Sequence, residues 1–233
     1  MDGGILANRT PCCEFISTCT LCLFDIDREL LFRLNCKAKV RMASSASDYR
    51  SFVKVRAATV DDLDAIEVIV QQVVKAMNDS GNFQWDQVYP LRADFAKDVA
   101  NGELWVASNM NGEGHILGFA AITEEQSIEY KEVGWDITIP ALVMHRAAVA
   151  TYAQGKGVCG LLFKKQDELS VKRGYNLVRV DTNSDNKAMQ AAIIKAGYEY
   201  SGNCRLLSKP ETMKFMCFQK TLPAEGTTTD DSS

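Results

Sequence analysis

A glycine-containing segment in the second half of the chain has the residue types of an anion site. An apolar run from Ala141 to Ala150 precedes it, and a helical pattern follows. A strand that ends in such a turn and opens a helix places several backbone N–H groups around one point, where the helix dipole adds positive potential. The segment consists of Gln154, Gly155, Lys156, Gly157, Val158 and Cys159.

Glycine at positions 155 and 157 lets the backbone approach a bulky phosphate, and Lys156 adds a positive charge at the rim. The same residues also fit a plain tight turn between a strand and a helix. A Walker A loop needs Gly-Lys-Ser/Thr, whereas here Lys156 is followed by Gly157, and a Rossmann fingerprint needs three glycines early in a βαβ unit. These two phosphate-binding motifs are therefore disfavoured.

The elements that must position this loop alternate between strand and helix patterns. Residues 52–56 alternate like a strand, and Thr59 is a candidate N-cap with Asp61 and Asp62 in the first helical turn. The turn-rich residues 109–114 predict a hairpin connection. We expect helices at about 59–77, 91–100, 157–173 and 186–196, and strands at about 52–56, 104–108, 116–122, 141–150, 176–181, 198–206 and 213–222. This order predicts a mixed α/β fold.

The length and composition predict one folded domain with appended ends. The chain has 233 residues, of which 46% are hydrophobic, enough to bury a full core. Residues 1–50 lack sustained periodicity and are expected to be a flexible or targeting extension, with a linker at residues 42–48. Residues 51–222 form the expected domain, and the small polar residues of 223–233 predict a disordered tail.

The charge balance disfavours polyanionic partners. A net charge of -4 gives no reason to expect nucleic acid or an anionic membrane as a partner, because those surfaces favour basic patches. It is mildly compatible with an amine substrate. No apolar run reaches the roughly 18 residues of a spanning helix, and Asp2 and Glu14 stand where a secretion signal needs basic residues. A cytoplasmic protein is expected, with organellar targeting left open.

The cysteines do not indicate a disulfide framework or a metal site. Five of the eight precede residue 37, and the remaining three are spread through predicted helices and strands. Cys19 and Cys22 have the spacing of a zinc or redox pair, but no second such pair or histidine pair lies nearby. We therefore expect no metal.

The loop from Gln154 to Cys159 resembles the Gln/Arg-x-x-Gly-x-Gly/Ala loop of the GNAT superfamily of N-acetyltransferases. Cys159 stands where that family usually has glycine or alanine. In the family the loop follows the fourth strand, binds the pyrophosphate of acetyl-CoA, and precedes a helix, a fifth strand and a helix that ends at a Gly-aromatic pair. Val149, residues 178–181 and Gly197-Tyr198 occupy those places here.

The resemblance covers about residues 52–222 and implies a particular sheet. GNAT proteins have a mixed, mostly antiparallel central sheet flanked by helices, with the fourth and fifth strands splayed apart. The chain also resembles a bacterial-type subfamily of unassigned substrate. The shared residues are Gln84, Trp85, Asp86, Tyr89, Pro90, Trp135, His145, Arg146, Asp181, Thr182, Asn186, Met189 and Gln190.

The resemblance also implies the contacts of acetyl-CoA, the acetyl donor. In the family the exposed backbone of the fourth strand pairs with the pantetheine arm, which implicates Ala147 and Val149. Exposed strand edges bind extended amide chains in this way, and a backbone N–H there would also stabilise an oxyanion. Asn186 is expected to contact the cofactor through its side-chain amide, although it also fits a helix cap.

The resemblance also bears on the general base and the general acid. Many relatives use a glutamate on the fourth strand, where this chain has Val143. His145 lies two residues on and therefore on the same face of the strand, and a histidine with its usual pKa of about 6.5 is a suitable base. A buried structural histidine is the alternative. Many relatives have a tyrosine that serves as the general acid, and Ile193 stands at that position here. This leaves another tyrosine, such as Tyr89, or solvent as the acid.

The remaining candidates belong to the acceptor side. Trp85, Asp86 and Tyr89 could line a pocket, and Asp181 and Thr182 end a central strand, where α/β sheets present functional groups. Structural alternatives exist for several of them: Trp85 and Trp135 as core residues, and Arg146 paired with Asp181 as a buried ion pair.

Three functions follow from these residues. The first is transfer of an acetyl group from acetyl-CoA to a primary amine of a small molecule or peptide. The second is an N-terminal or lysine acetyltransferase of proteins, and the third is a non-catalytic acyl-CoA-binding regulatory module. The sequence also leaves a homodimer open.

Overall fold

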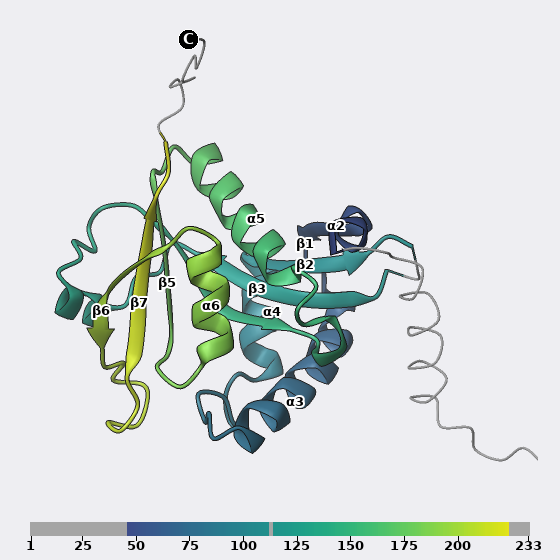
Figure 1. Ribbon diagram of the computed structural model, residues 1–233, viewed down its shortest axis with the longest axis horizontal. Coiled ribbons are helices and arrows are strands. Elements are labelled where there is room, and N and C mark those ends of the chain that lie inside the picture. The colour runs from purple at the N-terminus through teal and green to yellow at the C-terminus, as the bar shows by residue number, and fades with distance from the viewer. Residues whose placement is uncertain (1–45, 112–113, 224–233) are drawn as a thin grey trace, which may run out of the picture. The chain divides into compact units, whose positions relative to one another are not determined.

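The computed structural model describes residues 46–111 and 114–223, which belong to one compact unit (Figure 1). Most of the predicted extension at 1–50 and of the predicted tail at 223–233 lies outside the described residues. Seven strands form one sheet in the order β1-β2-β3-β4-β5-β7-β6. They are β1 Val53–Ala57, β2 Leu104–Asn109, β3 Ile116–Thr123, β4 Leu142–Val149, β5 Leu177–Asn183, β6 Glu199–Cys204 and β7 Phe215–Thr221.

All neighbouring strands are antiparallel except β4 and β5, which are parallel. This confirms the predicted mixed, mostly antiparallel α/β sheet, and β2 and β3 form the predicted hairpin. The helices are α2 Ala46–Ser51, α3 Leu63–Asp79, α4 Arg92–Ala100, α5 Val158–Lys172 and α6 Lys187–Lys195, with 3-10 turns η1 Val60–Asp62, η2 Ile128–Val133 and η3 Thr151–Ala153. None of the helices in the described ranges is long and apolar enough to cross a membrane.

A polar cluster fixes the way β1 leads into α3. The Asp62 carboxylate accepts the backbone N–H of Thr59 at 2.8 Å and forms a bidentate pair with Arg56, both bonds being 2.7 Å. Thr59 is the N-cap of η1, which continues into α3, as the sequence predicted. The bonds from Arg56 hold the pKa of the Asp62 carboxyl below its usual value, although burial opposes them.

Helices cover both faces of the sheet. All eight residues of β3 are buried, which requires a covering layer on each side because successive side chains point to opposite faces. Figure 1 shows α5 and α6 in front of the strands, with α3 and α4 below and behind them. Strand β3 is accordingly apolar along its whole length up to Thr123.

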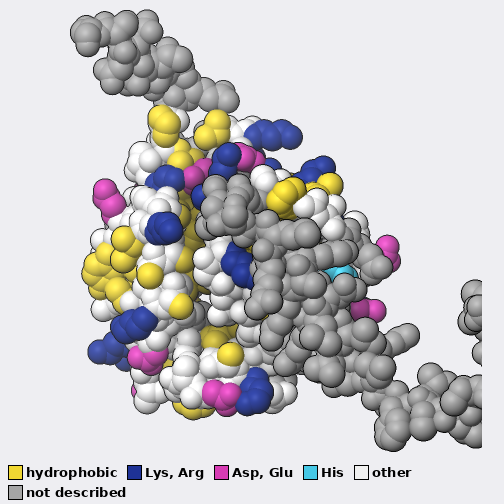
Figure 2. All heavy atoms as spheres, turned by 45° about the vertical axis from the view of Figure 1, so that its right-hand side comes forward, with side chains coloured by type: hydrophobic (Ala, Val, Ile, Leu, Met, Phe, Trp, Pro, Cys, Tyr) yellow, Lys and Arg dark blue, Asp and Glu magenta, His cyan; other side chains and the backbone are white. Residues whose placement is uncertain are grey.

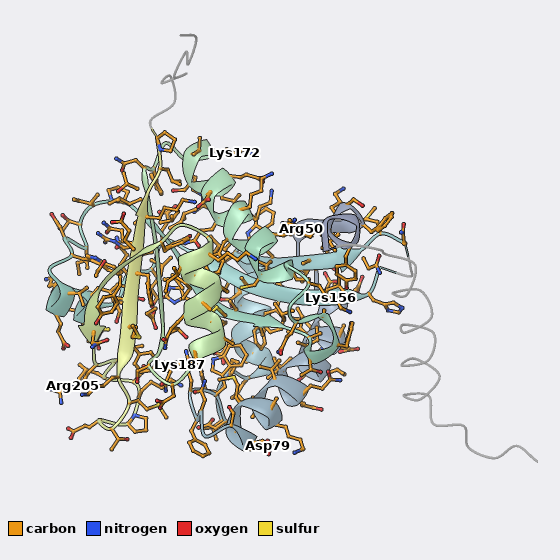
Figure 3. All side chains as sticks on the ribbon, in the orientation of Figure 1. Arg50, Asp79, Lys156, Lys172, Lys187 and Arg205 are labelled. Atoms are coloured by element: carbon orange, nitrogen blue, oxygen red, sulfur yellow. The ribbon has the colours of Figure 1, made fainter. Side chains whose placement is uncertain are left out.

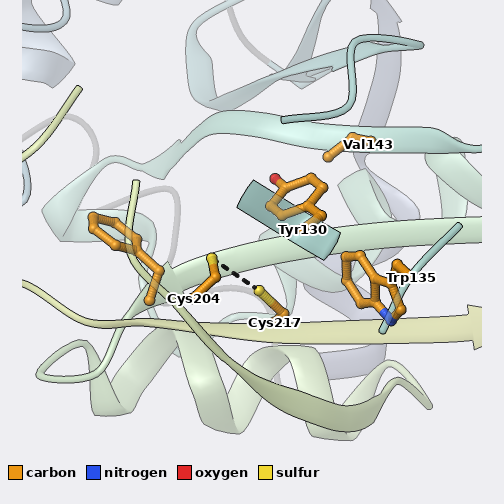
Figure 4. Packing of buried hydrophobic residues seen from close by; sticks show 6 residues of the cluster. Tyr130, Trp135, Val143, Cys204 and Cys217 are labelled. Atoms are coloured by element: carbon orange, nitrogen blue, oxygen red, sulfur yellow. Dashed lines mark hydrogen bonds between the residues drawn. The ribbon is translucent and has the colours of Figure 1, made fainter. Parts of the chain in front are cut away.

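A second apolar cluster lies beside β5 and β7 (Figure 4). Tyr130 of η2 packs edge to face on Trp135, with ring centroids 5.2 Å apart. Beneath them the thiols of Cys204 and Cys217 are free and in contact, with their sulfurs 3.3 Å apart. Val143 belongs to the same cluster and is fully buried. Trp135 is thus a core residue, the structural alternative given above.

The strands β4 and β5 pair over a short stretch and then separate. In the described part of the chain their pairing runs from Leu142 with Val178 to Met144 with Val180, while β4 continues to Val149. Arg146 has a φ of 44° at an irregularity in the pairing of β3 with β4, so β4 bends just after it leaves β5. The predicted splay between these strands is therefore present.

A buried glutamine holds the two strands together before they separate. Gln166 of α5 is fully buried, and its amide donates to the carbonyls of Leu142 in β4 and Arg179 in β5, at 2.8 and 3.0 Å. Its oxygen accepts the Tyr198 hydroxyl at 2.9 Å. All its polar atoms are satisfied, so this contact fixes where the strands begin to open.

The start of the fold differs from the sequence prediction. We expected the ordered domain near Phe52, but helix α2 precedes it, and Tyr49 is buried. The serine- and alanine-rich composition of this stretch resembles a linker, and the contacts that order its end come from residues far along the chain.

Candidate active site

A cavity of about 340 Å³ lies where β4 and β5 separate. Residues 144–147 of β4 and residues 180–182 of β5 line it, and these are the residues at which pairing stops and the strands diverge. The opening of the sheet therefore exposes side chains of two central strands to one shared space. The other residues that line it come from α3, η2, α6 and β7, and from the segments before α4, η2, α6 and β7.

His145 faces this cavity. Its Nε2 lies 3.1 Å from the carbonyl oxygen of Glu125. Because a carbonyl only accepts, Nε2 carries the hydrogen in this contact, and in the neutral imidazole Nδ1 is then the acceptor nitrogen. Val143, on the same face of β4, is buried in the apolar cluster, so His145 is the nearer of the two to the cavity.

Arg146 is held by an aspartate from another layer. Its Nε and Nη2 donate to the carboxylate of Asp98 in α4 at 2.8 and 2.7 Å, and both side chains are largely buried. The suggested ion pair between Arg146 and Asp181 is therefore absent. Arg146 has a left-handed backbone, and its side chain reaches Asp98 of α4. Burial raises the pKa of the Asp98 carboxyl, and the bonds from Arg146 oppose that shift.

Asp181 faces the cavity from β5 and is bonded by a tyrosine. Tyr130 is only 1% exposed, and its hydroxyl donates to the Asp181 Oδ1 at 2.5 Å. Burial raises the pKa of the Asp181 carboxyl, while the nearby His145 and the Tyr130 hydroxyl act in the opposite direction. Burial likewise raises the pKa of Tyr130, so its hydroxyl stays protonated as a donor.

Of the other predicted pocket residues, three line the cavity and one lies outside it. Trp85, Tyr89 and Thr182 line it, and Trp85 and Thr182 are also buried. Trp85 is therefore both a core residue and a residue of the cavity wall. Asp86 is exposed and caps a turn, since its Oδ1 accepts the N–H groups of Val88 and Tyr89 at 2.8 and 2.9 Å. Its contribution is to shape the segment that carries Tyr89.

The predicted phosphate loop lies between η3 and α5. Gly155 and Gly157 have φ values of 73° and 84°, which non-glycine residues rarely adopt. Gly157 is the N-cap of α5 and offers no side-chain cap, so the first N–H groups of the helix have no partner within the helix. The Gln154 amide donates to the carbonyl of Val149 at 3.3 Å, tying the loop to the end of β4.

The N-terminal helix α2 lies against this loop. The Lys156 ammonium sits 5.1 Å from the ring centroid of Tyr49, and the Arg50 side chain is so close to Gly157 that a Cβ there would lie 2.9 Å from its Cδ. Figure 3 shows Lys156 and Arg50 on the same side of the fold. The expected extension therefore ends against the predicted cofactor loop.

The loop and the cavity are connected through two helices. The loop residues do not line the cavity, but the Cys159 sulfur lies 4.0 Å from the sulfur of Met189, which does. Burial raises the pKa of the Cys159 thiol to about 12, so it is a packing group and no nucleophile. Asn186 also lines the cavity, and its Oδ1 accepts the Met189 N–H at 3.2 Å, so it caps α6.

Sequence reasoning missed several residues of the cavity, and Tyr130 and Lys209 are the two with the clearest polar contacts. Tyr130 lies in a segment without periodicity. Lys209 comes from the turn before β7, where its ammonium sits 4.0 Å from the ring centroid of Tyr89 and donates to the Gln84 carbonyl at 3.0 Å. Burial lowers the pKa of Lys209. No local pattern could have identified either residue, because both reach the cavity through tertiary packing.

The surface seen in Figure 2 carries mixed charges. Lys and Arg side chains lie singly among Asp, Glu and apolar side chains there, without forming one basic patch on the coloured atoms of that face.

Comparisons with known proteins bear on the fold. No protein-family model matches the chain, and no curated protein matches its sequence. Solved structures do. A GNAT-family acetyltransferase of Streptococcus agalactiae is 24% identical with a TM-score of 0.62, covering 73% of this chain and 96% of its own. A Listeria monocytogenes GNAT-family acetyltransferase is 18% identical with a TM-score of 0.57, covering 73% of this chain and 95% of its own.

A third structure is an acetyltransferase of Salmonella typhimurium solved with its cofactor acetyl-CoA. It is 15% identical, with a TM-score of 0.52, and the match covers 78% of this chain and 99% of that one. The seven-stranded sheet with its parallel β4–β5 pair agrees with these structures. This chain has the fold of the GNAT-family acetyltransferases.

Proposed function

We propose that this chain is an acetyl-CoA-dependent N-acetyltransferase that acts on a primary amine of a small molecule. The observation that carries the proposal is the separation of β4 from β5, which opens a cavity beside the strand that ends at the glycine loop. This arrangement supports a donor site and an acceptor site that share one strand.

The described residues fit acetyl-CoA. The uncapped start of α5 suits a pyrophosphate, with Gly155, Gly157 and Lys156 around it. Beyond Met144, the edge of β4 that faced β5 has no strand partner among the described residues, so the backbone near Ala147 and Val149 is available to the amides of a pantetheine arm. Asn186 would add a side-chain contact.

Acetyl-CoA supplies an acetyl group already activated as a thioester. The chain would position the amine, accept a proton from it and stabilise the oxyanion with a backbone N–H of β4. We assign the base to His145, because its Nε2 is engaged by the Glu125 carbonyl and its Nδ1 is left as the acceptor. Tyr89, with its hydroxyl 3.5 Å from Arg146 Nη1, is the candidate acid that protonates the leaving thiolate.

The size and lining of the cavity favour a small acceptor. About 340 Å³ is near the lower end of ligand pockets, and apolar side chains such as Trp85, Met144 and Phe215 line much of it. A peptide acceptor is the second candidate, since solved neighbours include ribosomal-protein-alanine N-acetyltransferases of Escherichia coli and Brucella melitensis. Acetylation confined to peptides in a panel of amines and peptides would select that candidate.

The first test is calorimetric titration of acetyl-CoA into the full chain and into Gly155→Glu. A Cβ at Gly155 meets nothing within 4 Å, so the variant adds a carboxylate to the loop without a collision. We expect affinity to fall by at least about a hundredfold, because like charges would meet at the pyrophosphate.

Gly174→Glu is the matched control. Gly174 follows the other end of α5, has the same φ of 73° and also has nothing within 4 Å of a Cβ. It carries the same backbone strain at the negative end of the helix dipole, far from the loop, and should bind acetyl-CoA as the wild type does. Equal affinity in Gly155→Glu and Gly174→Glu, or no binding by the folded wild type, would refute the donor site.

A further inference from the structure

Asp181 is a carboxylate without a cationic partner inside a lined cavity. Its side chain forms no ion pair with any residue of 46–111 or 114–223. Tyr130 is the one side chain in those ranges that hydrogen-bonds to it. Carboxylates in protein interiors are normally paired with a cation or fully hydrogen-bonded, because an isolated charge loses its hydration.

The nearby cations are engaged elsewhere. Arg146 lines the cavity but is committed to Asp98 through two short bonds. Lys209 lies over the ring of Tyr89 and donates to a backbone carbonyl. The other carboxylate of the cavity, Glu125, is exposed, so water can solvate it. Asp181, which is partly exposed and interacts electrostatically with His145, is therefore the carboxylate of this cavity that has neither a lysine nor an arginine partner.

We propose that Asp181 binds the ammonium group of the acceptor, and that this contact restricts the acceptor to primary amines that are cationic and carry an apolar body. The proposal rests on the proposed function and names the substrate class of its acceptor site. Tyr130 acts as a positioning residue, because its buried hydroxyl fixes one carboxylate oxygen and leaves the other for the ligand.

Three observations support this class. Burial raises the pKa of the Asp181 carboxyl, and a bound cation would offset the cost that causes the shift. Met144 and Val180 are the last residues that pair β4 with β5, and His145 and Asp181 are the residues that follow them. The ammonium would therefore be held beside the proposed base. The aromatic side chains of Trp85, Tyr89 and Phe215 provide apolar walls for the remainder of the molecule.

The test compares two probes that differ in charge. We would titrate 2-phenylethylamine and 2-phenylethanol into the full chain in the presence of coenzyme A, which allows no acetyl transfer. The wild type is expected to bind the amine at least about tenfold more tightly than the alcohol, the ratio that a buried hydrogen bond to a charged group gives. In Asp181→Asn, which keeps an oxygen to accept the Tyr130 hydroxyl, this preference should disappear while alcohol binding is retained.

Glu125→Gln is the control, since it removes a carboxylate from the same cavity at an exposed position. It should change the ratio by less than about twofold, because water screens exposed charges. Tyr130→Phe should lower the ratio in part without changing alcohol binding, which a merely structural role would not do.

An equal loss of both probes in Asp181→Asn would overturn the proposal and make Asp181 a residue that shapes the cavity. An unchanged ratio in Asp181→Asn would overturn it too, as would a wild type that binds neither probe. These outcomes are separate from failure of the proposed function, because acetyl-CoA binding and its loss in Gly155→Glu are measured without an acceptor.

Discussion

The donor side and the acceptor side of the opened sheet are built from different materials. On the donor side, the candidate contacts are backbone groups: the start of α5 with glycines at 155 and 157, and the unpaired edge of β4. On the acceptor side, they are side chains from distant elements, with Asp181 in β5, Tyr130 in η2 and His145 in β4.

This difference separates what each side can tolerate. A backbone site requires only that small residues permit the right path of the chain, so most side chains around it are free to vary. A side-chain site depends on buried polar pairs, and loss of one partner leaves the other without compensation. Breaking a buried polar pair on the acceptor side should therefore chiefly lower stability, whereas substitutions in the donor loop should chiefly lower affinity for the ligand.

The largest effect is expected from Arg146→Leu. It would leave the buried carboxylate of Asp98 without its cation and should lower the free energy of unfolding by about 3 kcal/mol, measured by urea denaturation. Lys75→Met is the control, because Lys75 pairs with Asp79 at an exposed position and its loss should be hard to measure. Equal losses of unfolding free energy in both variants would contradict the view that the buried pair contributes more to stability than an exposed pair does.

A smaller effect on stability and a clear effect on affinity are expected from Gly157→Ala. The left-handed φ of 84° and the Arg50 side chain, 2.9 Å from a Cβ, should together lower the unfolding free energy by about 1 to 2 kcal/mol. Acetyl-CoA affinity should fall by about tenfold. Gly174→Ala shares the left-handed backbone, so calorimetry should show that it keeps its affinity while thermal unfolding shows a comparable strain.

A stabilising effect is expected from Asp181→Asn. Because burial raises the pKa of Asp181 in the folded state, its protonated form contributes stability below the pKa of the unfolded chain, and this contribution is lost as pH rises through the folded pKa. The neutral variant should therefore have a higher Tm than the wild type at pH 7, and the difference should shrink below pH 4, about the ordinary pKa of aspartate. A lower Tm at pH 7 would contradict the assignment of an uncompensated charge.

The smallest effect is expected from Lys156→Ala. On a site made of backbone groups, one partly exposed lysine should change acetyl-CoA affinity by about threefold, and the difference should shrink as salt is added. Calorimetry at two salt concentrations measures this. A loss as large as that of Gly157→Ala would show that the loop depends on its side chains.

The contrast between a donor side made of backbone groups and an acceptor side made of side chains also explains how much of the site could be predicted from the sequence. Residues 154–159 and the surrounding strands are local patterns, because a glycine turn, a helix start and an apolar run occupy adjacent positions. The bond between Tyr130 and Asp181 spans 51 positions, and the pair of Arg146 with Asp98 spans 48. No periodicity selects such partners, and Arg146 was paired with Asp181 in the sequence interpretation because β4 and β5 are neighbours.

Arg146 has a left-handed backbone at the bend of β4, and its residue type gives no means of predicting that conformation. Asp86 shows the converse, since its neighbours line the cavity while its own carboxylate bonds two backbone N–H groups of a turn. A prediction of pocket residues from sequence therefore identifies segments more reliably than it identifies which side chains point inward.

Helix α5 carries the proposed phosphate loop at its first turn and, near its middle, Gln166, which bonds both separating strands. From residue 158 to residue 166 the axis rises about 12 Å, and a helix of this length behaves as a stiff rod. If helix α5 tilts when its N-terminus binds a ligand, the side-chain amide of Gln166 would move with it. That amide bonds both β4 and β5 where the two strands begin to separate. Occupancy of the donor site and the clearance available to the acceptor would then be mechanically linked, which favours an order of arrival in which acetyl-CoA comes first.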